Sequence, residues 1–467
     1  MAPDPDAGDD AGDDTLTFFG VGTDGRPAFP PLAVADVAKL ATASDVPATT
    51  RPKVAGTLGP PSWVDRERLE EAGWGVVYAE GLDPAIQRAL EPLVERRGAS
   101  ANSKQGLFKA LTVAPTDTIA TLQQRWGFSP GVIDPATVPH YLLLVGDPTQ
   151  IPFELQQALD VDFAVGRLDL ATAAEVSAYV ASVLRAEDAP VRRPGAGVFA
   201  PRNPDDGATA QSSDNLVAPL VAALTSQHLT VETWTGAQAT KAALASLLGA
   251  EAPALVFGAC HGAVARCGAA DQRAVHGALI TQEWPGPLAA PAKLLPEWRL
   301  TADELSASLD GLVAMFYTCF GGGVPARSQY PYYLGEGVRD LAPAPFVTAL
   351  PRAMLARGAG AVVAHVERCW DVGFKWLGVR APQVEAILST LVALLRGRRV
   401  GNAVSDLNTR YASLSTQFHD RKLEAELQGT RIPPRELARM WMHAFDARGW
   451  IVLGDPAVRI APQRAHA

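Results

Sequence analysis

The sequence predicts an α/β protein built on a mostly parallel sheet. Short apolar runs with strand character alternate with segments of helical periodicity over most of the chain. The alternation is most regular between residues 196 and 454, and several apolar runs end in turns that contain glycine. This pattern is typical of parallel sheets, in which a helix connects each strand to the next.

The first elements of this pattern lie before residue 196. The apolar run 140–146 predicts a buried strand, and it ends in the turn dipeptide Asp147-Pro148. A second strand is predicted over 162–165, and helical periodicity follows over 172–185. Residues 190–195 are rich in Pro, Arg and Gly, which indicates a linker.

A longer series of elements follows the linker. Strands are predicted at 197–200, 229–234, 254–259, 312–318, 360–366 and 450–453. Helices are predicted at 215–225, 241–248 and 346–357, and the region 381–439 is expected to be mostly helical. Thr301 and Glu304 have the spacing of a capping box, which predicts the start of a short helix there.

These elements divide the chain into three parts. Residues 1–14 contain six Asp residues and no aliphatic anchor, so they are expected to form a disordered acidic tail. Residues 15–195 are expected to form an N-terminal α/β accessory subdomain. Residues 196–467 are expected to form a second subdomain, which contains the regular series of strands and helices.

The composition excludes several classes of function. Of the 467 residues, 48% are hydrophobic and 19% are charged, as expected for a soluble protein with a sizeable core. The net charge is −9, and without the acidic tail it would be −3, so the basic excess of a nucleic-acid-binding protein is absent. No apolar run reaches the roughly 18–20 residues that span a bilayer. The acidic N-terminus does not resemble a secretion signal. Four cysteines do not make a disulfide framework in a chain of this length. We therefore expect a cytoplasmic protein with neither nucleic acid nor a membrane as its partner.

Two of the predicted strands end in reactive side chains. The strand 254–259 runs into Cys260-His261-Gly262, and the strand 312–318 runs into Cys319, which three glycines follow closely. Ligands bind beyond the carboxyl ends of parallel strands, so neighbouring strands would place His261 and Cys319 across one cleft. A cysteine nucleophile needs a nearby base and donors for an oxyanion, and glycines leave backbone N–H groups accessible. Either residue alone is more typical of a core position, but the pair predicts a catalytic site.

A zinc site is a weaker interpretation of the cysteines. Cys260, His261 and Cys267 lack the paired spacing and the fourth ligand of a structural zinc site, and Cys369 lies far along the chain. Cys260 alternates with His261 along a strand, so its side chain is expected to face the core. The sequence therefore predicts no metal and no cofactor.

The motifs Phe257-Gly-Ala-Cys-His-Gly262 and Met315-Phe-Tyr-Thr-Cys319 resemble the catalytic strands of gingipain-type cysteine peptidases, which belong to the caspase–hemoglobinase group. Five further segments match that family in the same order, and the first 135 residues match poorly. The resemblance implies a caspase-like fold with helices on both faces of the sheet, and it makes residues 196–467 the catalytic subdomain. The five further segments are 141–152, 163–167, 345–355, 360–370 and 453–459.

The resemblance also implies roles for individual residues. His261 would be the general acid and base, and Cys319 the nucleophile. The backbone N–H groups of Gly262 and Cys319 would form the oxyanion hole. Asp214 lies where the family has the S1 carboxylate that binds a basic P1 side chain, although it is equally suited to cap the helix predicted from residue 215. Trp370 matches the aromatic lid of S1, and a core position suits it equally well.

One role is left open by the resemblance. The carboxylate that supports the catalytic histidine in the family falls near Asn203 of this chain, which carries no charge. Asp205 and Asp206 are the two neighbouring residues that could take its place.

The expected function is that of an intracellular cysteine endopeptidase. By resemblance, it would cleave protein substrates after a basic P1 residue, in limited proteolysis for signalling, defence or cell death. The alternative is a non-catalytic scaffold that has the same fold and binds a partner in the cleft. The presence of both His261 and Cys319 favours the enzyme over the scaffold.

Overall fold

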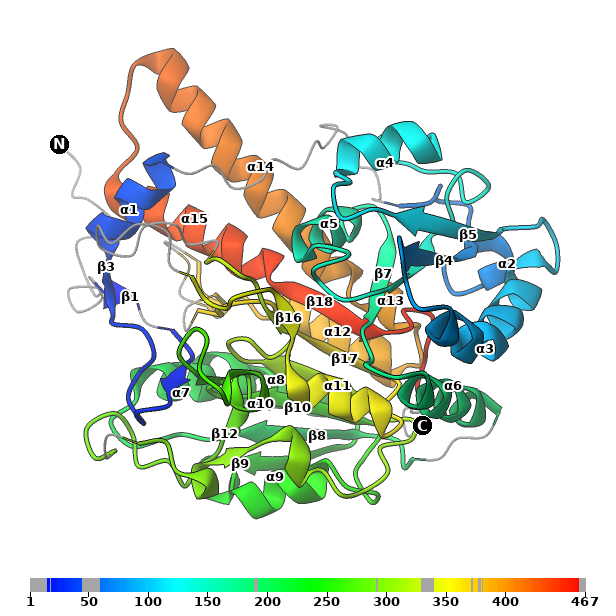
Figure 1. Cartoon of the computed structure of the whole chain (residues 1–467). Coiled ribbons are helices and arrows are strands. Elements are labelled where there is room, and N and C mark those ends of the chain that lie inside the picture. Colours follow the sequence, from blue (N-terminus) through cyan, green and yellow to red (C-terminus); the bar gives the residue numbers. More distant parts are fainter. Residues whose placement is uncertain are drawn as a thin grey trace.

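The computed structural model describes residues 15–16, 18–43, 59–188, 192–290, 293–328, 340–370, 373–376, 379 and 381–461 (Figure 1). The predicted acidic tail, residues 1–14, lies outside the described residues. No helix of the described chain is long and apolar enough to cross a membrane.

A ten-stranded sheet runs through the centre of the described chain, with the strand order β5-β4-β6-β7-β18-β17-β14-β10-β8-β9. Every neighbouring pair is parallel except β17 with β18, so the predicted mostly parallel sheet is confirmed. The strands are β4 (Trp74–Ala79), β5 (Phe108–Val113), β6 (Tyr141–Val145), β7 (Ala164–Leu168), β8 (Ala196–Ala200), β9 (Val231–Thr235), β10 (Leu255–Ala259), β14 (Val313–Tyr317), β17 (Ala361–His365) and β18 (Trp450–Gly454).

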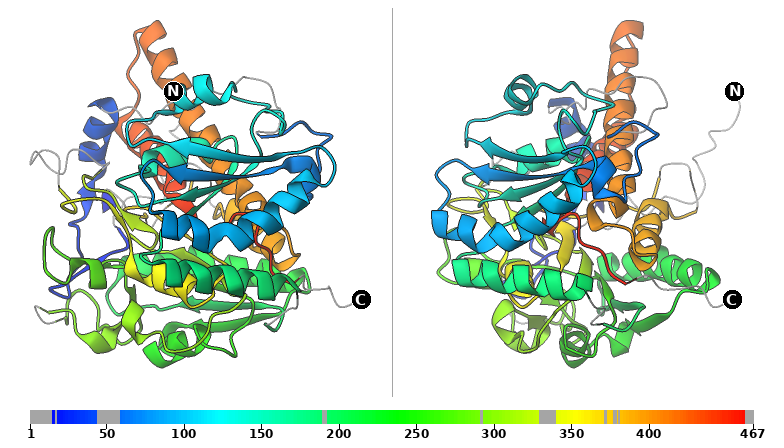
Figure 2. Two further views of the ribbon diagram at one scale, coloured as in Figure 1. Left: turned by 45° about the vertical axis from the view of Figure 1, so that its right-hand side comes forward. Right: turned by 90° about the vertical axis from the view of Figure 1, so that its right-hand side faces the viewer.

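Helices cover both faces of this sheet (Figure 2). On one face, α6 lies between α3 and α11 and contacts both of them. On the other face, α8, α12, α14 and α15 contact one another in series. The helices named here are α3 (Pro84–Asn102), α6 (Ala173–Asp188), α8 (Ala218–Ser226), α11 (Ala349–Ala356), α12 (Glu385–Leu395), α14 (Ser405–Gln428) and α15 (Pro434–Arg448).

Shorter elements complete the chain. The remaining helices are α1 (Val34–Ala43), α2 (Leu69–Ala72), α4 (Ile119–Trp126), α5 (Phe153–Leu159), α7 (Gly207–Ser212), α9 (Lys241–Leu247), α10 (Gln272–Val275) and α13 (Val400–Ala403). A π-helical turn spans Ser213–Val217, and 3-10 turns span Gly236–Gln238, Pro296–Trp298 and Ala302–Glu304. Two-residue strands are β1 (Thr15–Leu16), β2 (Val21–Gly22), β3 (Leu32–Ala33), β11 (Ala263–Val264), β12 (Leu279–Ile280), β13 (Arg299–Leu300), β15 (Gly323–Val324) and β16 (Phe346–Val347).

The strand β6 shows why an uninterrupted apolar run predicts a central strand. Successive side chains of a strand point to opposite faces, so a strand that is covered on both faces needs apolar residues throughout. Tyr141 and Leu143 belong to the core cluster that includes residues of α3, whereas Leu142 and Leu144 belong to the cluster that includes residues of α4 and α5. All five residues of β6 are buried.

The direction of the strands determines where a site can form. The strands β17, β14, β10 and β8 are adjacent and parallel, so their carboxyl ends meet at one edge of the sheet. The strand β18 runs antiparallel to β17 and parallel to β7, so β4–β7 point the other way. The predicted boundary at residue 195 falls just before β8, and the sheet continues across it.

Candidate active site

Four neighbouring strands each supply one residue to the candidate site. Ala259 at the end of β10 is paired with Tyr317 at the end of β14. His261 and Cys319 each follow two residues later, so they leave the sheet at the same level and side by side. Asp206 lies in the segment after β8, and Cys369 lies in the segment after β17. The order across the sheet edge is therefore Asp206, His261, Cys319, Cys369.

Asp206 holds the imidazole of His261. Its Oδ2 atom lies 2.8 Å from His261 Nε2, and both side chains are almost fully buried. The same Oδ2 accepts hydrogen bonds from the Thr209 backbone N–H at 3.0 Å and from the Thr209 hydroxyl at 2.5 Å, because Asp206 is the N-cap of α7. Burial alone would raise the pKa of Asp206, but the His261 interaction and the Thr209 hydrogen bonds outweigh it and hold the pKa below its ordinary value.

The second ring nitrogen of His261 is available for proton transfer. Its Nδ1 atom has no hydrogen-bond partner among the described residues. A carboxylate at Nε2 favours a proton on that nitrogen, and this leaves the lone pair of Nδ1 free. The ring is held between two aromatic side chains, with ring centroids 5.5 Å from Phe19 and 5.3 Å from Trp284. The arrangement fixes both the orientation and the tautomer of the imidazole.

The thiol of Cys319 faces the Cys369 backbone. Its Sγ atom accepts a hydrogen bond from the Cys369 N–H at 3.3 Å and lies 3.6 Å from the Cys369 carbonyl oxygen. The thiol thus accepts from the N–H and donates its S–H to the carbonyl oxygen of the same residue. Cys319 has no exposed surface and His261 is 2% exposed, so the candidate site is closed to solvent in this structure.

Gly262 permits a very close approach between the two strand ends. A Cβ atom at residue 262 would lie 2.1 Å from the carbonyl oxygen of Cys319, which no side chain could tolerate without a backbone shift. Neither the Gly262 N–H nor the Cys319 N–H donates to another backbone group of the described chain. Two adjacent N–H donors without backbone partners are what an oxyanion requires.

Strained backbone is concentrated around this site. Four non-glycine residues of the described chain have a positive φ, and three of them lie beside site residues. Asp205 (φ 53°) precedes Asp206, Phe320 (φ 57°) follows Cys319, and Glu367 (φ 67°) comes two residues before Cys369. Such conformations cost about 1 kcal/mol or more each and often occur at functional sites. They turn the chain sharply at the points where the site residues are presented.

Asp214 and Trp370, the two residues expected to form S1, lie in different environments. Asp214 belongs to the π-helical turn, its side chain is 60% exposed, and its Oδ1 accepts a hydrogen bond from Arg202 at 2.6 Å. Trp370 directly follows Cys369 and has no exposed surface. Its N–H donates to Asp446 at 2.9 Å, and its ring lies 4.1 Å from that of Phe18.

The remaining cysteines do not form a metal site. Cys260 is buried and Cys267 is exposed. Burial raises the pKa of the Cys260 thiol to about 12, as expected for a core position. Among the described residues there is no group of three or more His, Cys, Asp or Glu side chains that could hold a metal ion.

Sequence reasoning left one member of the site open and missed another. Asp206 was one of two open candidates, and the structure distinguishes them because Asp206, and not Asp205, reaches His261. Asp206 lies three residues before Thr209, which is the spacing of a helix N-cap and its N3 residue, and this spacing could have favoured Asp206 over Asp205. Cys369 was considered only as a zinc ligand, although it follows a predicted strand of the same sheet, as Cys319 does. The role of residues 18–29 beside the site had no sequence signal.

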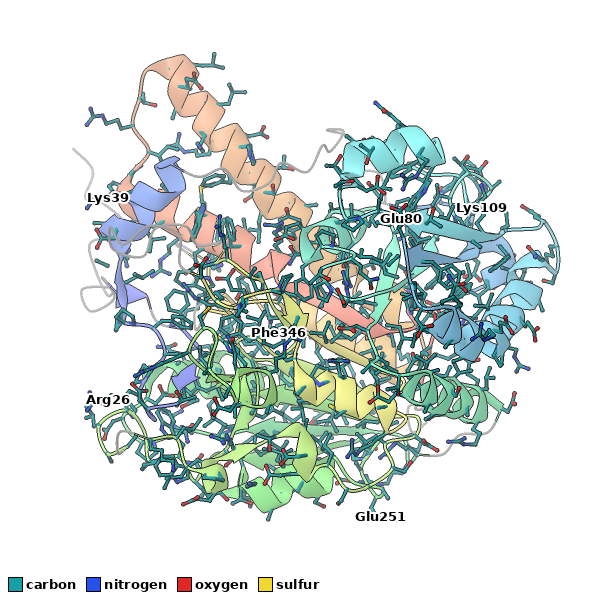
Figure 3. The ribbon with its side chains drawn as sticks, in the orientation of Figure 1. Arg26, Lys39, Glu80, Lys109, Glu251 and Phe346 are labelled. Atoms are coloured by element: carbon teal, nitrogen blue, oxygen red, sulfur yellow. The ribbon has the colours of Figure 1, made fainter. Side chains whose placement is uncertain are left out.

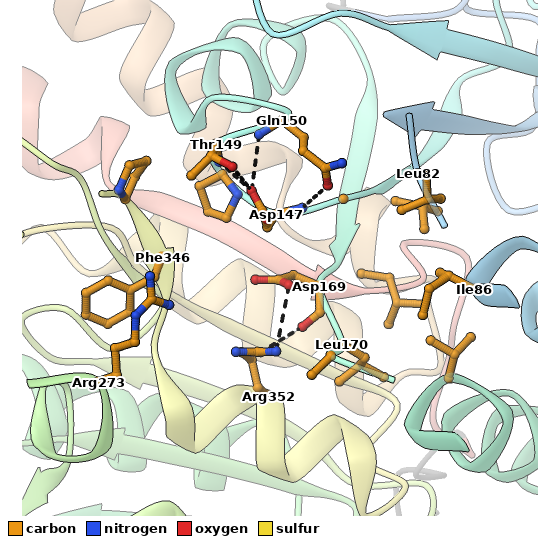
Figure 4. A pocket seen from close by; sticks show the side chains of 17 residues that line it. Leu82, Ile86, Asp147, Thr149, Gln150, Asp169, Leu170, Arg273, Phe346 and Arg352 are labelled. Carbon is orange, nitrogen blue, oxygen red and sulfur yellow. Dashed lines mark hydrogen bonds and ion pairs between the residues drawn. The ribbon is translucent and has the colours of Figure 1, made fainter. Parts of the chain in front are cut away.

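A separate cavity of about 310 Å³ lies away from these residues (Figure 4). It is formed by the segments that follow β6 and β7, together with residues of α10, α11 and β16. Arg352 donates to the Asp169 carbonyl oxygen at 3.0 Å, and the Arg273 guanidinium lies over the Phe346 ring. Neither Cys319 nor His261 lines this cavity, so it is not part of the candidate active site.

No family model and no curated protein matches this chain. Three solved structures show a distant likeness. A structure described as that of a protease has a TM-score of 0.46 and 14% identity, over 84% of this chain and 78% of the other.

The second structure is the complex of the pro- and mature domains of RgpB from Porphyromonas gingivalis, with a TM-score of 0.41 and 11% identity, over 83% of this chain and 80% of the other. The third is the separase–securin complex of Saccharomyces cerevisiae, with a TM-score of 0.34 and 9% identity, over 90% of this chain and 22% of the other. All three TM-scores are below 0.5, and all three identities are below 15%.

Proposed function

We propose that this protein is a cysteine endopeptidase in which Cys319 is the nucleophile and His261 is the general acid and base. The observation that carries the proposal is the alignment of Asp206, His261 and Cys319 along one sheet edge, with Asp206 Oδ2 2.8 Å from His261 Nε2. A nucleophile, a base and a group that orients the base are the three parts that covalent catalysis requires.

The reaction would begin with transfer of the Cys319 thiol proton to His261 Nδ1. The thiolate would attack the scissile carbonyl carbon, and the carbonyl oxygen would take the negative charge. His261 would then protonate the leaving amine as the C–N bond breaks, which leaves a thioester on Cys319. Water, deprotonated by His261, would hydrolyse the thioester, and the returning proton would restore the thiol. Asp206 would stabilise the imidazolium at each stage.

The oxyanion would be held by the N–H groups of Gly262 and Cys319. Both groups lack a backbone partner in the described chain, and the close approach of Gly262 to the Cys319 carbonyl supports this assignment. Each such donor contributes about 3 kcal/mol of transition-state stabilisation in comparable sites. The Cys369 N–H would stabilise the thiolate before the attack.

Specificity for a basic P1 residue is a separate part of the proposal, and it rests on the resemblance at Asp214. The Asp214 carboxylate is paired with Arg202, so a P1 guanidinium would have to replace that partner. A bidentate Arg–carboxylate pair is stronger than a single contact, which would favour P1 Arg over P1 Lys.

A peptide-library cleavage screen tests the enzyme. Cys319→Ala and His261→Ala are expected to abolish cleavage, whereas the control variants Cys267→Ser and His228→Ala at exposed positions are expected to keep it. Thermal unfolding shows whether each variant is folded. Cleavage that survives in a folded Cys319→Ala protein would contradict the assignment.

The non-catalytic scaffold has one observation in its favour. Cys319 and His261 are closed to solvent, as a site that no longer meets a substrate could be. A peptidyl thiol-reactive probe separates the two functions, because it labels Cys319 only if the site can open. Labelling that requires both Cys319 and His261 supports the enzyme, and absence of labelling under every condition supports the scaffold.

A further inference from the structure

An N-terminal hairpin occupies the groove beside the candidate nucleophile. Its outgoing arm donates three backbone hydrogen bonds, from Phe19 N–H to the Cys369 carbonyl at 3.3 Å, from Val21 N–H to the Gly262 carbonyl at 3.0 Å and from Thr23 N–H to the Val264 carbonyl at 3.1 Å. The strand β2 pairs in parallel with β11, and Phe18 forms an antiparallel bridge with Trp370. The arm thus lies in an extended conformation between two walls of the groove.

One wall directly follows His261, and the other contacts the thiol of Cys319. The Cys369 N–H bonds to Cys319 Sγ, and the Cys369 carbonyl accepts from Phe19. On the other wall, Gly262 follows His261 directly, and its carbonyl accepts from Val21. Backbone from Phe19 to Val21 therefore passes between the two walls, one hydrogen bond away from the residue that contacts the thiol.

The side chains of the hairpin fill the groove. Phe19 has no exposed surface, and its ring centroid lies 5.5 Å from that of His261 and 5.6 Å from that of Tyr317. Phe18 is 4% exposed and packs on Trp370. Burial of a Phe side chain contributes roughly 1.5–3 kcal/mol, so two adjacent rings make a strong apolar anchor.

The hairpin is bonded to the body at its turn as well as along its outgoing arm, because Trp284 Nε1 donates to the Gly25 carbonyl at 2.9 Å and Leu294 N–H to the Thr23 carbonyl at 2.7 Å. Its arms are joined by hydrogen bonds from Gly22 N–H to the Arg26 carbonyl at 2.7 Å and from Ala28 N–H to the Gly20 carbonyl at 2.9 Å. Beyond its return arm, α1 packs against α15. Asp24 and Arg26 at the turn are exposed, and Figure 3 shows Arg26 at the edge of the molecule.

We propose that the groove between Gly262–Val264 and Cys369–Trp370 is the peptide-binding surface of the site, and that residues 18–23 occupy it as a built-in inhibitor. This inference rests on the proposed function, because it takes the residues that flank the groove as the catalytic pair. The occupant is an extended segment with two adjacent aromatic side chains. A substrate would bind by the same strand pairing, and so must displace the hairpin.

An attached occupant competes strongly with free peptides. A segment tethered in the same chain has an effective concentration that reaches the millimolar range for short linkers, so micromolar substrate cannot displace it without a loss of hairpin contacts. The closed state also explains why Cys319 and His261 are inaccessible although the rest of the site is assembled. Any event that removes the Phe19 ring or cuts the hairpin is expected to open the site.

The labelling rate of Cys319 with iodoacetamide tests the inference without requiring catalysis. The full chain with Cys267→Ser removes the exposed thiol, and mass mapping identifies the labelled residue. Phe19→Ala is expected to raise the labelling rate at least 10-fold. Phe163→Ala is the matched control, because Phe163 is 3% exposed in the separate core cluster of the accessory half and does not touch the hairpin.

Two further experiments test the inference independently of the Phe19→Ala variant. A cleavage sequence for an unrelated protease, inserted between the exposed residues Arg26 and Pro27, opens the hairpin without changing any side chain, and serves if Phe19→Ala does not fold. A synthetic peptide of residues 15–24 is then expected to restore slow labelling to the opened protein. The same peptide with Ala in place of Phe19 is expected to be at least 10-fold less effective.

The outcomes separate this inference from the proposed function. Equal labelling of Phe19→Ala and Phe163→Ala, or labelling of wild-type Cys319 as fast as that of exposed Cys267, would overturn the inhibitor. If the opened protein is labelled quickly but cleaves no peptide of the library, the hairpin covers the site as proposed and the endopeptidase assignment fails. If wild type cleaves peptides as fast as the opened protein, the endopeptidase stands and the inhibitor fails.

Discussion

Replacing Asp206 with Asn tests how this carboxylate supports His261. Oδ2 of Asp206 accepts from His261 Nε2 at 2.8 Å and from two groups of Thr209. In the variant, the amide oxygen is the only atom that can accept from Thr209, so it is held in the place of Oδ2. His261 then keeps its Nε2–H tautomer, and the variant loses the negative charge but not the geometry.

The magnitude follows from that charge. An imidazolium and a carboxylate whose centres lie about 4 Å apart attract by about 4 kcal/mol at an effective dielectric constant of 20. The amide dipole of the substituted side chain retains part of this attraction, so we expect a loss of about 3 kcal/mol in the transition state that contains the imidazolium. At 1.36 kcal/mol for each factor of ten, kcat/KM is expected to fall by about 100- to 200-fold.

The assay is kcat/KM on the best peptide of the library screen, measured in the opened protein described above. Asp205→Asn is the matched control, because Asp205 is the neighbouring residue with φ 53° and Asn tolerates this conformation. It is expected to retain nearly the full rate. A folded Asp206→Asn protein within threefold of the parent, while Cys319→Ala is inactive, would refute a supporting role for Asp206.

Four other outcomes are expected. Gly262→Ala should lower both activity and the Tm of thermal unfolding, because the new Cβ would lie 2.1 Å from the Cys319 carbonyl oxygen. An unchanged Tm would argue against that contact. Asp214→Asn should lower kcat/KM for P1 Arg and Lys by about fivefold and leave apolar P1 substrates unchanged, because an ion pair at a side chain that is 60% exposed contributes about 1 kcal/mol. A parent enzyme that ignores basic P1 residues would contradict it. Burial raises the pKa of Asp446 to about 6, so ionising this carboxyl costs the folded state about 3 kcal/mol of stability once the pH is above about 6. Denaturant titrations at about pH 7 should therefore show Asp446→Asn to be more stable than the parent, and a less stable variant would contradict this reasoning. Burial lowers the pKa of four histidines to about 3, namely His140, His276, His365 and His443. Below about pH 6.5 the unfolded chain binds protons at these residues and the folded chain does not, so the free energy of unfolding should fall by about 5 kcal/mol per pH unit. Circular dichroism should then show cooperative acid unfolding near about pH 5, and a gradual change would refute this expectation.

Local pattern was sufficient to predict most of the sheet. The predicted strands from residue 140 onward all occur within three residues of their observed bounds, and all except the edge strand β9 are buried on both faces. The helix predicted at 215–225 begins earlier, at Gly207, because Asp206 caps it and a π-helical turn continues it. The helix predicted at 346–357 begins at Ala349, because Phe346–Val347 pair with β15 instead.

Other parts depended on contacts between distant segments and could not be predicted. The strands β4 and β5 and the helix α3 lie in the region where the sequence matched no family motif, and they extend the same sheet. In the candidate site, His261 and Cys319 follow strand ends, which sequence can locate. The pairing of Asp206 with His261, the approach of Cys369 to the thiol and the closure by Phe19 arise from the order of strands in the sheet and from the path of the N-terminal hairpin.

The hairpin packs against the two strained loops of the site, and these loops are bonded to each other. Phe320, which follows Cys319, donates its N–H to the carbonyl of Glu367 at 2.5 Å, so two of the left-handed residues are bonded to each other. The return arm of the hairpin packs onto the same place, with the Phe29 ring 6.2 Å from that of Phe320 and the Arg368 guanidinium 4.0 Å above Phe29. Left-handed backbone persists only where surrounding contacts determine it, and here the hairpin supplies part of those contacts. Removal of the hairpin would therefore expose the nucleophile and also release the two loops that present Cys319 and Cys369. A bound substrate strand would then have to supply the contacts with which the hairpin had held these loops in place. Under the proposed inhibition, any strand that occupies the groove would assemble the site, so inhibition and substrate-dependent assembly would follow from the same contacts.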